Sequence, residues 1–153
     1  MHTESDNPYE VSVSRTIPGT PEEIFAILTD TEGHVAIDGS DSVKGTLEPQ
    51  RLEMGSRFGM KMRVGVPYRI KSTVVEFEPD RLIAWRHFGK HRWRYRLEPV
   101  DDGTLVTETF DWSQALSRKA IELMGYPKSH PPGMTKTLER LEAEVLRRRG
   151  ESE

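Results

Sequence analysis

Two ionisable side chains, His87 and Glu108, lie in phase with large aromatic residues along strand-like stretches of the chain. His87 follows Trp85 by two positions, and Glu108 precedes Phe110 by two. Because alternate side chains of a strand share a face, both polar groups are expected to point inward. A buried carboxylate needs a partner, so the two groups could act together as a general acid and base. They could equally be a satisfied polar pair that orients a ligand, and a register error of one residue would place both in water.

All three tryptophans fall between positions 82 and 112, on three successive strand-like alternations. Large aromatic side chains either pack into a solid core or line a pocket, and both interpretations stay open. Tyr68 and Tyr95 could each donate a hydrogen bond to a ligand carbonyl. The candidate ligand-binding residues are Phe58, Met60, Met62, Tyr68, Ile70, Trp85, His87, Trp93, Tyr95, Glu108, Phe110, Met134, Leu138 and Leu141.

The elements that would position these residues are mostly strands. A capping box, Thr20-Pro21-Glu22-Glu23, predicts a helix start, and a short helical turn is expected at 34–37. Further helices are predicted at 114–124 and, after a proline-rich joint at 127–133, from Met134 onward, where apolar residues follow a helical period. Alternation predicts strands at 9–17, 43–47, 56–66, 68–77, 82–88, 91–99 and 104–112, with a hairpin turn at 101–103.

This order of elements predicts the architecture. An antiparallel sheet and one long amphipathic helix must bury their apolar faces against each other, which gives an α+β two-layer domain. The sequence contains no internal repeat or separating linker, so residues 9–149 are expected to form a single domain. Residues 1–8 and 150–153 are polar and are expected to be flexible tails.

Composition narrows the function classes. The net charge of −3 disfavours an extended nucleic-acid surface, because phosphate binding requires positive potential. The chain has no cysteine, which fits a cytoplasmic protein, and its polar start lacks the apolar core of a secretion signal. No apolar run approaches the roughly 20 residues of a membrane span. The five histidines lack zinc-site spacing and no cofactor fingerprint is found, so neither a metal nor a cofactor is expected.

A stripe of basic residues lies in the same part of the sequence as the tryptophans. It could meet an anionic partner, such as a lipid headgroup, an acidic protein or RNA. It could also be an outer sheet face with ion pairs to Glu76, Glu78 or Asp111 on neighbouring strands. The stripe consists of Arg86, Lys90, His91, Arg92, Arg94 and Arg96.

Three segments carry a family resemblance: IPGTPEEIF (17–25), VEFEPDRLIAW (75–85) and LEPVDDGT (97–104). They resemble the polyketide cyclase/dehydrase and lipid-transport superfamily, the START-like or Bet v 1-like (SRPBCC) helix-grip proteins. The resemblance covers roughly residues 9–149. It implies a curved antiparallel sheet of about six or seven strands wrapped on a long C-terminal helix, with two short helices after the first strand.

The superfamily specifies fold better than function, because its members include passive carriers, aromatase/cyclases and chaperone-activating domains. It has no shared catalytic motif, so no catalytic residue is carried over, and His87 and Glu108 are only weak candidates. The chain departs from the usual pattern at 34–38, where many members carry a tryptophan or a proline pair. It also departs at 114–132, which looks longer than the usual connection and could form a lid or a partner surface.

The expected function is binding, for transport or sequestration, of a small hydrophobic or amphipathic molecule, lipid- or polyketide-like, in an internal cavity between the sheet and the C-terminal helix. The first alternative is a cofactor-independent polyketide aromatase/cyclase or dehydratase. The second is a protein-interaction module that uses residues 114–132 and the basic stripe. The expected partner is therefore a small ligand, with neither nucleic acid nor a membrane span, and the protein partner stays open.

Overall fold

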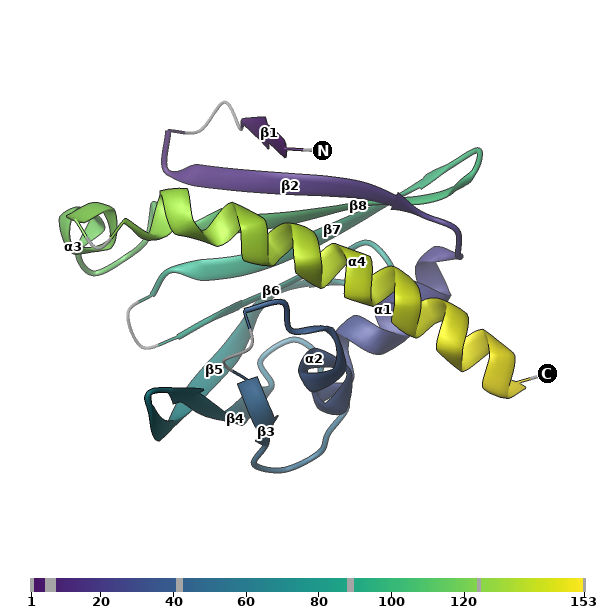
Figure 1. The fold of residues 1–153 in the computed structure, drawn as a ribbon, viewed down its shortest axis with the longest axis horizontal. Helices are drawn as coiled ribbons and strands as arrows, with labels where there is room; N and C mark the ends of the chain where they lie inside the picture. The colour runs from purple at the N-terminus through teal and green to yellow at the C-terminus, as the bar shows by residue number, and fades with distance from the viewer. Residues whose placement is uncertain (1, 5–7, 41–42, 88–89, 124, 153) are drawn as a thin grey trace.

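One antiparallel sheet curves around a long C-terminal helix, α4 (Tyr126–Ser152), in the computed structural model (Figure 1). The structure describes the chain except residues 1, 5–7, 41–42, 88–89, 124 and 153. The predicted α+β helix-grip architecture is confirmed. Within the described residues the sheet has eight strands. In sheet order they are β1 (His2–Glu4), β2 (Glu10–Ile17), β8 (Gly103–Asp111), β7 (Arg92–Val100), β6 (Leu82–Arg86), β5 (Val66–Glu78), β4 (Arg57–Val64) and β3 (Val43–Thr46).

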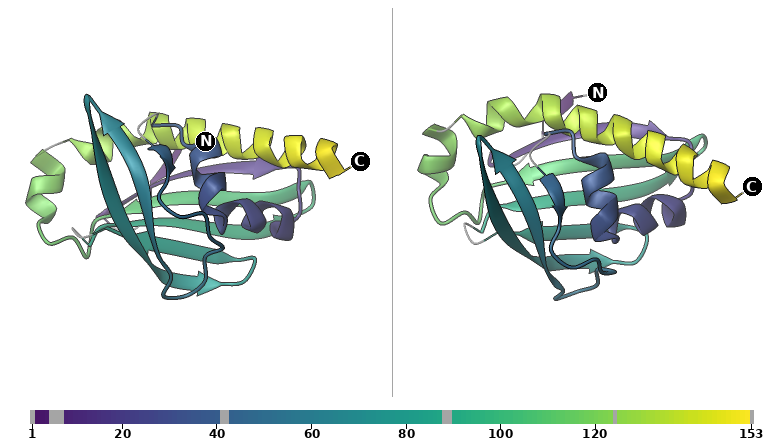
Figure 2. Two further views of the ribbon diagram at one scale, coloured as in Figure 1. Left: turned by 90° about the horizontal axis from the view of Figure 1, so that it is seen from below. Right: turned by 60° about the horizontal axis from the view of Figure 1, so that its bottom comes forward.

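The two short helices follow β2, as the resemblance implies. Helix α1 (Pro21–Leu28) begins with the predicted capping box, in which the Glu23 amide donates to Thr20 Oγ1 (3.1 Å) and the Thr20 amide to Glu23 Oε1 (3.0 Å). Helix α2 (Thr31–Ile37) is capped by Asp30, whose carboxylate accepts a hydrogen bond from the Glu32 amide at 3.0 Å. Both helices lie at the same end of the sheet as the C-terminal half of α4 (Figure 2).

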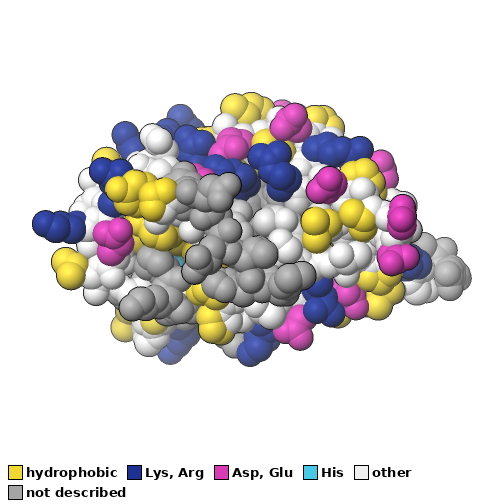
Figure 3. All heavy atoms as spheres, turned by 90° about the horizontal axis from the view of Figure 1, so that it is seen from above, with side chains coloured by type: hydrophobic (Ala, Val, Ile, Leu, Met, Phe, Trp, Pro, Cys, Tyr) yellow, Lys and Arg dark blue, Asp and Glu magenta, His cyan; other side chains and the backbone are white. Residues whose placement is uncertain are grey.

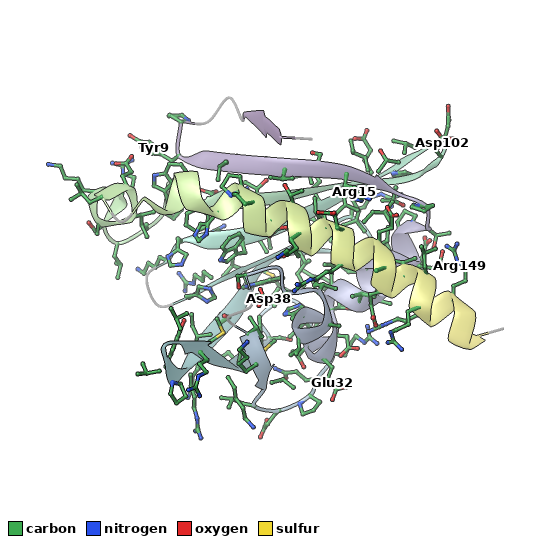
Figure 4. All side chains as sticks on the ribbon, viewed as in Figure 1. Tyr9, Arg15, Glu32, Asp38, Asp102 and Arg149 are labelled. Carbon is green, nitrogen blue, oxygen red and sulfur yellow. The ribbon has the colours of Figure 1, made fainter. Side chains whose placement is uncertain are left out.

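The chain after α2 is fastened to α4. The Gly39 amide donates to Thr137 Oγ1 at 2.9 Å, and the Arg140 guanidinium donates to the Asp38 carbonyl. A Cβ at position 39 would lie 2.3 Å from the Gly133 carbonyl oxygen, so only glycine permits this approach. Asp38 therefore lies where α2 meets α4 (Figure 4).

The interior near α1 is packed solid. Its side chains come from β2, α1, β7, β8 and the middle of α4, and they are almost completely excluded from solvent. Close packing of this kind supplies most of the stability of a domain of this size. The most deeply buried of these residues are Ile17, Ile24, Ile27, Leu28, Leu97, Val106, Leu138, Leu141 and Val145.

The structure differs from the sequence predictions around α4, and it adds secondary structure at the chain ends. Residues expected in flexible tails carry secondary structure: His2–Glu4 pairs with β2 as the added strand β1, and α4 continues to Ser152. The helix predicted at 114–124 is only α3 (Arg118–Leu123), and α4 begins at Tyr126 instead of near Met134. The helix continues through Pro131 and Pro132, although each proline removes a backbone donor and disfavours helical backbone at the residue before it.

Candidate ligand-binding site

A cavity of about 530 Å³ lies between the N-terminal third of α4, the end of α2 and strands β3 to β8. Its volume is within the range of about 300–1,000 Å³ that is typical of small-molecule sites. The wall contains aromatic rings and thioethers together with a few ionisable groups. The cavity therefore offers an apolar chamber with polar groups at defined places.

The strand register explains the aromatic wall. Trp85 on β6 pairs with Trp93 on β7, and Trp93 pairs with Phe110 on β8, so the three rings form one row across the sheet. Two residues further along β7, Tyr95 pairs with Glu108 on β8 in the next inward row. Because successive inward residues are two apart, the carboxylate lies one row away from the tryptophans.

Glu108 is the buried acid of the cavity, with 3% of its surface exposed. The Tyr95 hydroxyl hydrogen-bonds to its carboxyl group, but the Oε1 atom has no hydrogen-bond partner in the described part of the chain. Burial raises the pKa of Glu108 to about 8, the negative charge of Asp38 adds to the increase, and the Tyr95 hydrogen bond opposes it. The group is therefore mostly a neutral carboxylic acid at pH 7.

Three histidines gather on another side of the cavity. The rings of His87 and His91 are 5.2 Å apart, and His130 from α4 lies 5.0 Å from Trp93. Burial, with a smaller contribution from the charge of His91, lowers the pKa of His87 and of His130 to about 4. Ser72 Oγ and His87 Nδ1 are 2.8 Å apart, whereas His91 Nδ1 is buried without a hydrogen-bond partner among the described residues. These imidazoles are neutral at pH 7 and present polar nitrogens to the cavity.

His34 joins α2 to the aromatic wall. Its ring stacks on Trp85 at 4.6 Å, and its Nε2 lies 2.7 Å from the Leu28 carbonyl oxygen. Burial lowers the pKa of His34, so the ring is held as a neutral, hydrogen-bonded packing group. This contact closes the cavity on the side of α2.

Most predicted site residues lie around one space. Ten line the cavity: Phe58, Met60, Met62, Ile70, Trp85, His87, Trp93, Tyr95, Glu108 and Met134. His87 and Glu108 both belong to this wall, but they are not each other's partner, since His87 hydrogen-bonds to Ser72 and Glu108 to Tyr95. The predicted acid–base pair is thus two separate polar groups.

Four predicted residues lie outside the cavity wall. Tyr68 has the inward phase, but it lies so near the end of the β4–β5 hairpin that it is 42% exposed. Phe110 is fully buried behind Trp93, His91 and His130, whose rings lie 4.6–5.5 Å from it. Leu138 and Leu141 belong to the solid core, because the cavity ends near Thr137.

Sequence reasoning missed the residues contributed by loops and helix ends. His91 shares the phase of Trp93 and Tyr95, and Thr137 lies one helical turn after Met134, so these two had a usable signal. Ser72 on β5 likewise shares the phase of Ile70, and Val43 begins β3. The others lie in irregular or helical segments that alternation along strands cannot place. The missed lining residues are His34, Ile37, Asp38, Gly39, Ser40, Val43, Ser72, His91, His130, Gly133 and Thr137.

Part of the basic stripe is neutralised by acids on neighbouring strands. Arg94 donates to Glu76 (2.9 Å) and to Asp111 (3.0 Å), and it lies 3.5 Å from Glu10. Arg92 also donates to Glu76, at 2.9 Å. For these two arginines the outer-face interpretation of the stripe therefore holds.

Other candidate sites are weaker. A more open depression of about 670 Å³ lies beside Tyr9 and residues 113–119, and its lining is mostly polar and exposed. In the part of the chain that the structure describes, no three histidines, cysteines or carboxylates are placed to hold a metal ion. No helix among the described residues is long and apolar enough to cross a membrane.

Comparison with known proteins supports the same class of fold. The model of the polyketide cyclase/dehydrase and lipid transport family matches residues 8–146. The protein NE0264 of Nitrosomonas europaea superposes with a TM-score of 0.72 at 16% identity, covering 95% of this chain and 99% of that one. Ms6760 of Mycobacterium smegmatis superposes equally well, with a TM-score of 0.72 at 14% identity and coverage of 95% and 96%.

The chain belongs to the polyketide cyclase/dehydrase and lipid transport family. Among curated relatives, it is 38% identical over 149 residues to the uncharacterized protein Rv0088 of Mycobacterium tuberculosis. The match covers 93% of this chain but only 66% of that protein, so the chain spans about two-thirds of the length of this relative. Family membership supports a ligand-binding role in general.

Proposed function

We propose that the protein binds a small, mostly hydrophobic molecule with a polar group, lipid- or polyketide-like, in the cavity between the sheet and α4. The observation that carries this proposal is a cavity of about 530 Å³ that combines an aromatic and methionine wall with one partly unsatisfied, buried carboxyl group. A solid core would have no such volume. A purely structural carboxylate would have both oxygens satisfied.

The size of the cavity sets the expected affinity. A ligand that buries about 250 Å² of apolar surface gains about 6 kcal/mol at about 25 cal/mol per Å². Ordering and association costs offset several of these kilocalories, and hydrogen bonds to the polar wall restore some. Micromolar binding is the natural outcome, which suits a carrier that must also release its ligand.

Glu108 defines the polar end of the ligand. Because burial raises its pKa to about 8, this carboxyl group is mostly protonated at pH 7 and can donate a hydrogen bond. The Tyr95 hydroxyl already hydrogen-bonds to the same group. We therefore expect the ligand to place a carbonyl or hydroxyl oxygen near Glu108 and its apolar body along Trp85 and Trp93.

The first test is native mass spectrometry of the purified protein, with extraction and identification of any bound molecule. In parallel, N-phenyl-1-naphthylamine, a neutral apolar fluorophore, is titrated into the wild type and two variants. Trp93→Ala should weaken probe binding at least tenfold, because it removes a ring from the cavity wall. Tyr68→Ala, the matched aromatic control, should bind as wild type, since Tyr68 lies outside the wall. Full affinity in a folded Trp93→Ala protein would contradict the assignment of the cavity.

Catalysis is a second candidate, favoured by the pKa of Glu108 near neutrality. A carboxyl group with a pKa of about 8 can both give and accept a proton at physiological pH, as an aromatase/cyclase or dehydratase step requires. The test compares the molecules extracted from the wild type and from Glu108→Gln. A carrier yields the same molecule from both proteins. An enzyme yields product from the wild type and unreacted substrate from the variant.

A further inference from the structure

The β4–β5 hairpin carries an unusual concentration of positive charge. Residues 54–75 contain no aspartate or glutamate, although the whole chain has more acids than bases and a net charge of −3. All of the basic side chains in this segment are exposed. They are Arg57, Lys61, Arg63, Arg69 and Lys71.

Ion pairing does not explain why these basic residues lie together. Within the described residues none of the five makes a salt bridge, in contrast to Arg92 and Arg94 on the same sheet. Lys61 lies directly opposite Arg69 in the strand register, and like charges in this position destabilise a sheet. On the face drawn in Figure 3, by comparison, basic and acidic side chains are intermixed. The hairpin therefore retains uncompensated charge at a cost in stability.

The end of the hairpin is apolar and exposed. Val64 and Val66 flank Gly65, whose positive φ of 77° makes the tight turn, and each valine is 67% exposed. Tyr68 follows at 42% exposure. Figure 2 shows the hairpin of β4 and β5 extending beyond the rest of the sheet, with this turn at its far end. Water-exposed valines at a projecting tip gain free energy when a partner covers them.

We propose that the β4–β5 hairpin docks the protein on the surface of an anionic lipid bilayer. An apolar tip with basic residues on both flanking strands matches the bilayer interface, where the tip enters the acyl boundary and the cations meet anionic headgroups. A nucleic acid would pair with the charge but would leave the valines in water. An acidic protein would need an apolar recess at the place where the tip lands.

The same hairpin forms a wall of the cavity. Its inner face contributes Met60, Met62 and Ile70, while Lys61 and Arg69 point to the outside. Docking through this hairpin would hold the cavity beside the lipid from which a hydrophobic ligand can enter. This consequence rests on the proposed ligand binding, whereas the docking itself does not.

The test is flotation of the protein with vesicles of pure phosphatidylcholine and with vesicles containing about one-third phosphatidylglycerol. The wild type should float only with the anionic vesicles, and less so as the salt concentration rises. Lys61→Gln with Arg69→Gln should weaken this binding by roughly 25-fold, because each base near an anionic surface contributes roughly a factor of five. Val64→Ser with Val66→Ser should weaken it by about fivefold or more through loss of the apolar contact.

The control is Arg96→Gln with Lys136→Gln, which removes two exposed bases elsewhere on the molecule and should float as wild type. Absence of flotation, equal flotation with neutral vesicles, or an equal loss in the control would overturn the proposal. So would flotation by the valine variant equal to that of the wild type, because charge alone would then attach the protein and the tip would not enter the acyl boundary. Titration with N-phenyl-1-naphthylamine in solution should be unchanged in all of these variants, so failure of docking and failure of ligand binding are distinguishable.

Discussion

The interior between the sheet and α4 has two ends that contain different kinds of side chain, a packed end near α1 and a hollow end near the start of α4. Near α1, aliphatic side chains such as Ile24, Leu97 and Leu141 are completely or almost completely buried and fill the interior. Near the start of α4, aromatic rings, methionines and histidines surround a cavity of about 530 Å³. Glu108 and the half-buried His87, whose pKa values are strongly shifted by burial, both belong to the hollow end.

The difference shows how one small core can serve stability and binding together. The aliphatic side chains of the packed end fit closely together, and removal of a methylene lowers the stability of the folded protein. The packed end therefore tolerates substitution poorly. Aromatic rings are rigid, so a wall made of them keeps its shape around the cavity. Polar groups in that wall remain available to hydrogen-bond to a ligand. We expect the packed end to determine stability and the hollow end to determine binding.

The largest expected effect is the loss of a packed leucine. Leu141→Ala should lower the free energy of unfolding by about 3 kcal/mol, within the usual range of about 2–5 kcal/mol for a buried leucine. Met62→Ala, a change of similar size at the half-buried edge of the cavity, should cost less than about 1 kcal/mol, because Met62 already borders open volume. Urea denaturation of the two variants measures both effects. Equal destabilisation would show that the two ends contribute alike and would break the comparison.

The second effect is a pH dependence that belongs to the hollow end. The pKa of Glu108 is about 8 in the folded protein against an ordinary value of 4.5, so between these values the folded state keeps a proton that the unfolded state has lost. Its contribution to stability is complete below about pH 4.5 and is lost as the pH rises through 8. His87 and His130 act in the opposite direction between about pH 4 and 6.5, because burial lowers the pKa of both imidazoles.

The window from about pH 6.5 to 8 isolates Glu108 when the wild type is compared with Glu108→Gln, because the histidines contribute alike to both proteins. Across it the wild type should lose about 2 kcal/mol of unfolding free energy that Glu108→Gln does not lose. Urea denaturation of both proteins at the two ends of the window gives this difference. Parallel pH profiles would mean that Glu108 has an ordinary pKa and that the hollow end is wetter than its burial indicates.

The packed end could be predicted from the sequence because the sequence patterns that specify it are local. The capping box at Thr20, the alternation along β7 and β8, and the apolar stripe of α4 each specify an element and its inward face. These periodic patterns predicted the fold and brought ten of the fourteen candidate residues to one cavity. Phase alone could not tell how deep an inward residue lies, which is why Leu138 and Phe110 proved to be core.

The rest of the site depends on contacts between residues that are far apart in the sequence, which no periodic pattern predicts. Asp38 and Gly39 reach the cavity because α2 is tied to α4 through Thr137 and Arg140, nearly a hundred residues later in the chain. His130 was placed in a proline-rich joint, whereas the structure continues the helix through it and turns the ring onto Trp93. The sequence also did not show which basic residues are paired. Arg92 and Arg94 of the basic stripe form ion pairs, whereas the basic residues of the β4–β5 hairpin form none within the described part of the chain.

The smallest expected effect compares a helix that packs into the solid core, α1, with a mostly exposed one, α3. Thr20→Ala removes the capping box of α1 and should cost about 1 kcal/mol, because α1 packs its buried face into the solid core. Ser117→Ala removes the corresponding cap of α3, whose Ala120 amide donates to Ser117 Oγ at 3.1 Å. It should cost clearly less, since the mostly exposed α3 can fray without unfolding the domain. Both variants should bind N-phenyl-1-naphthylamine as the wild type does, because neither helix lines the cavity. A loss of probe affinity in Thr20→Ala would mean that the packed end holds the cavity open, and the division of labour between the ends would fail.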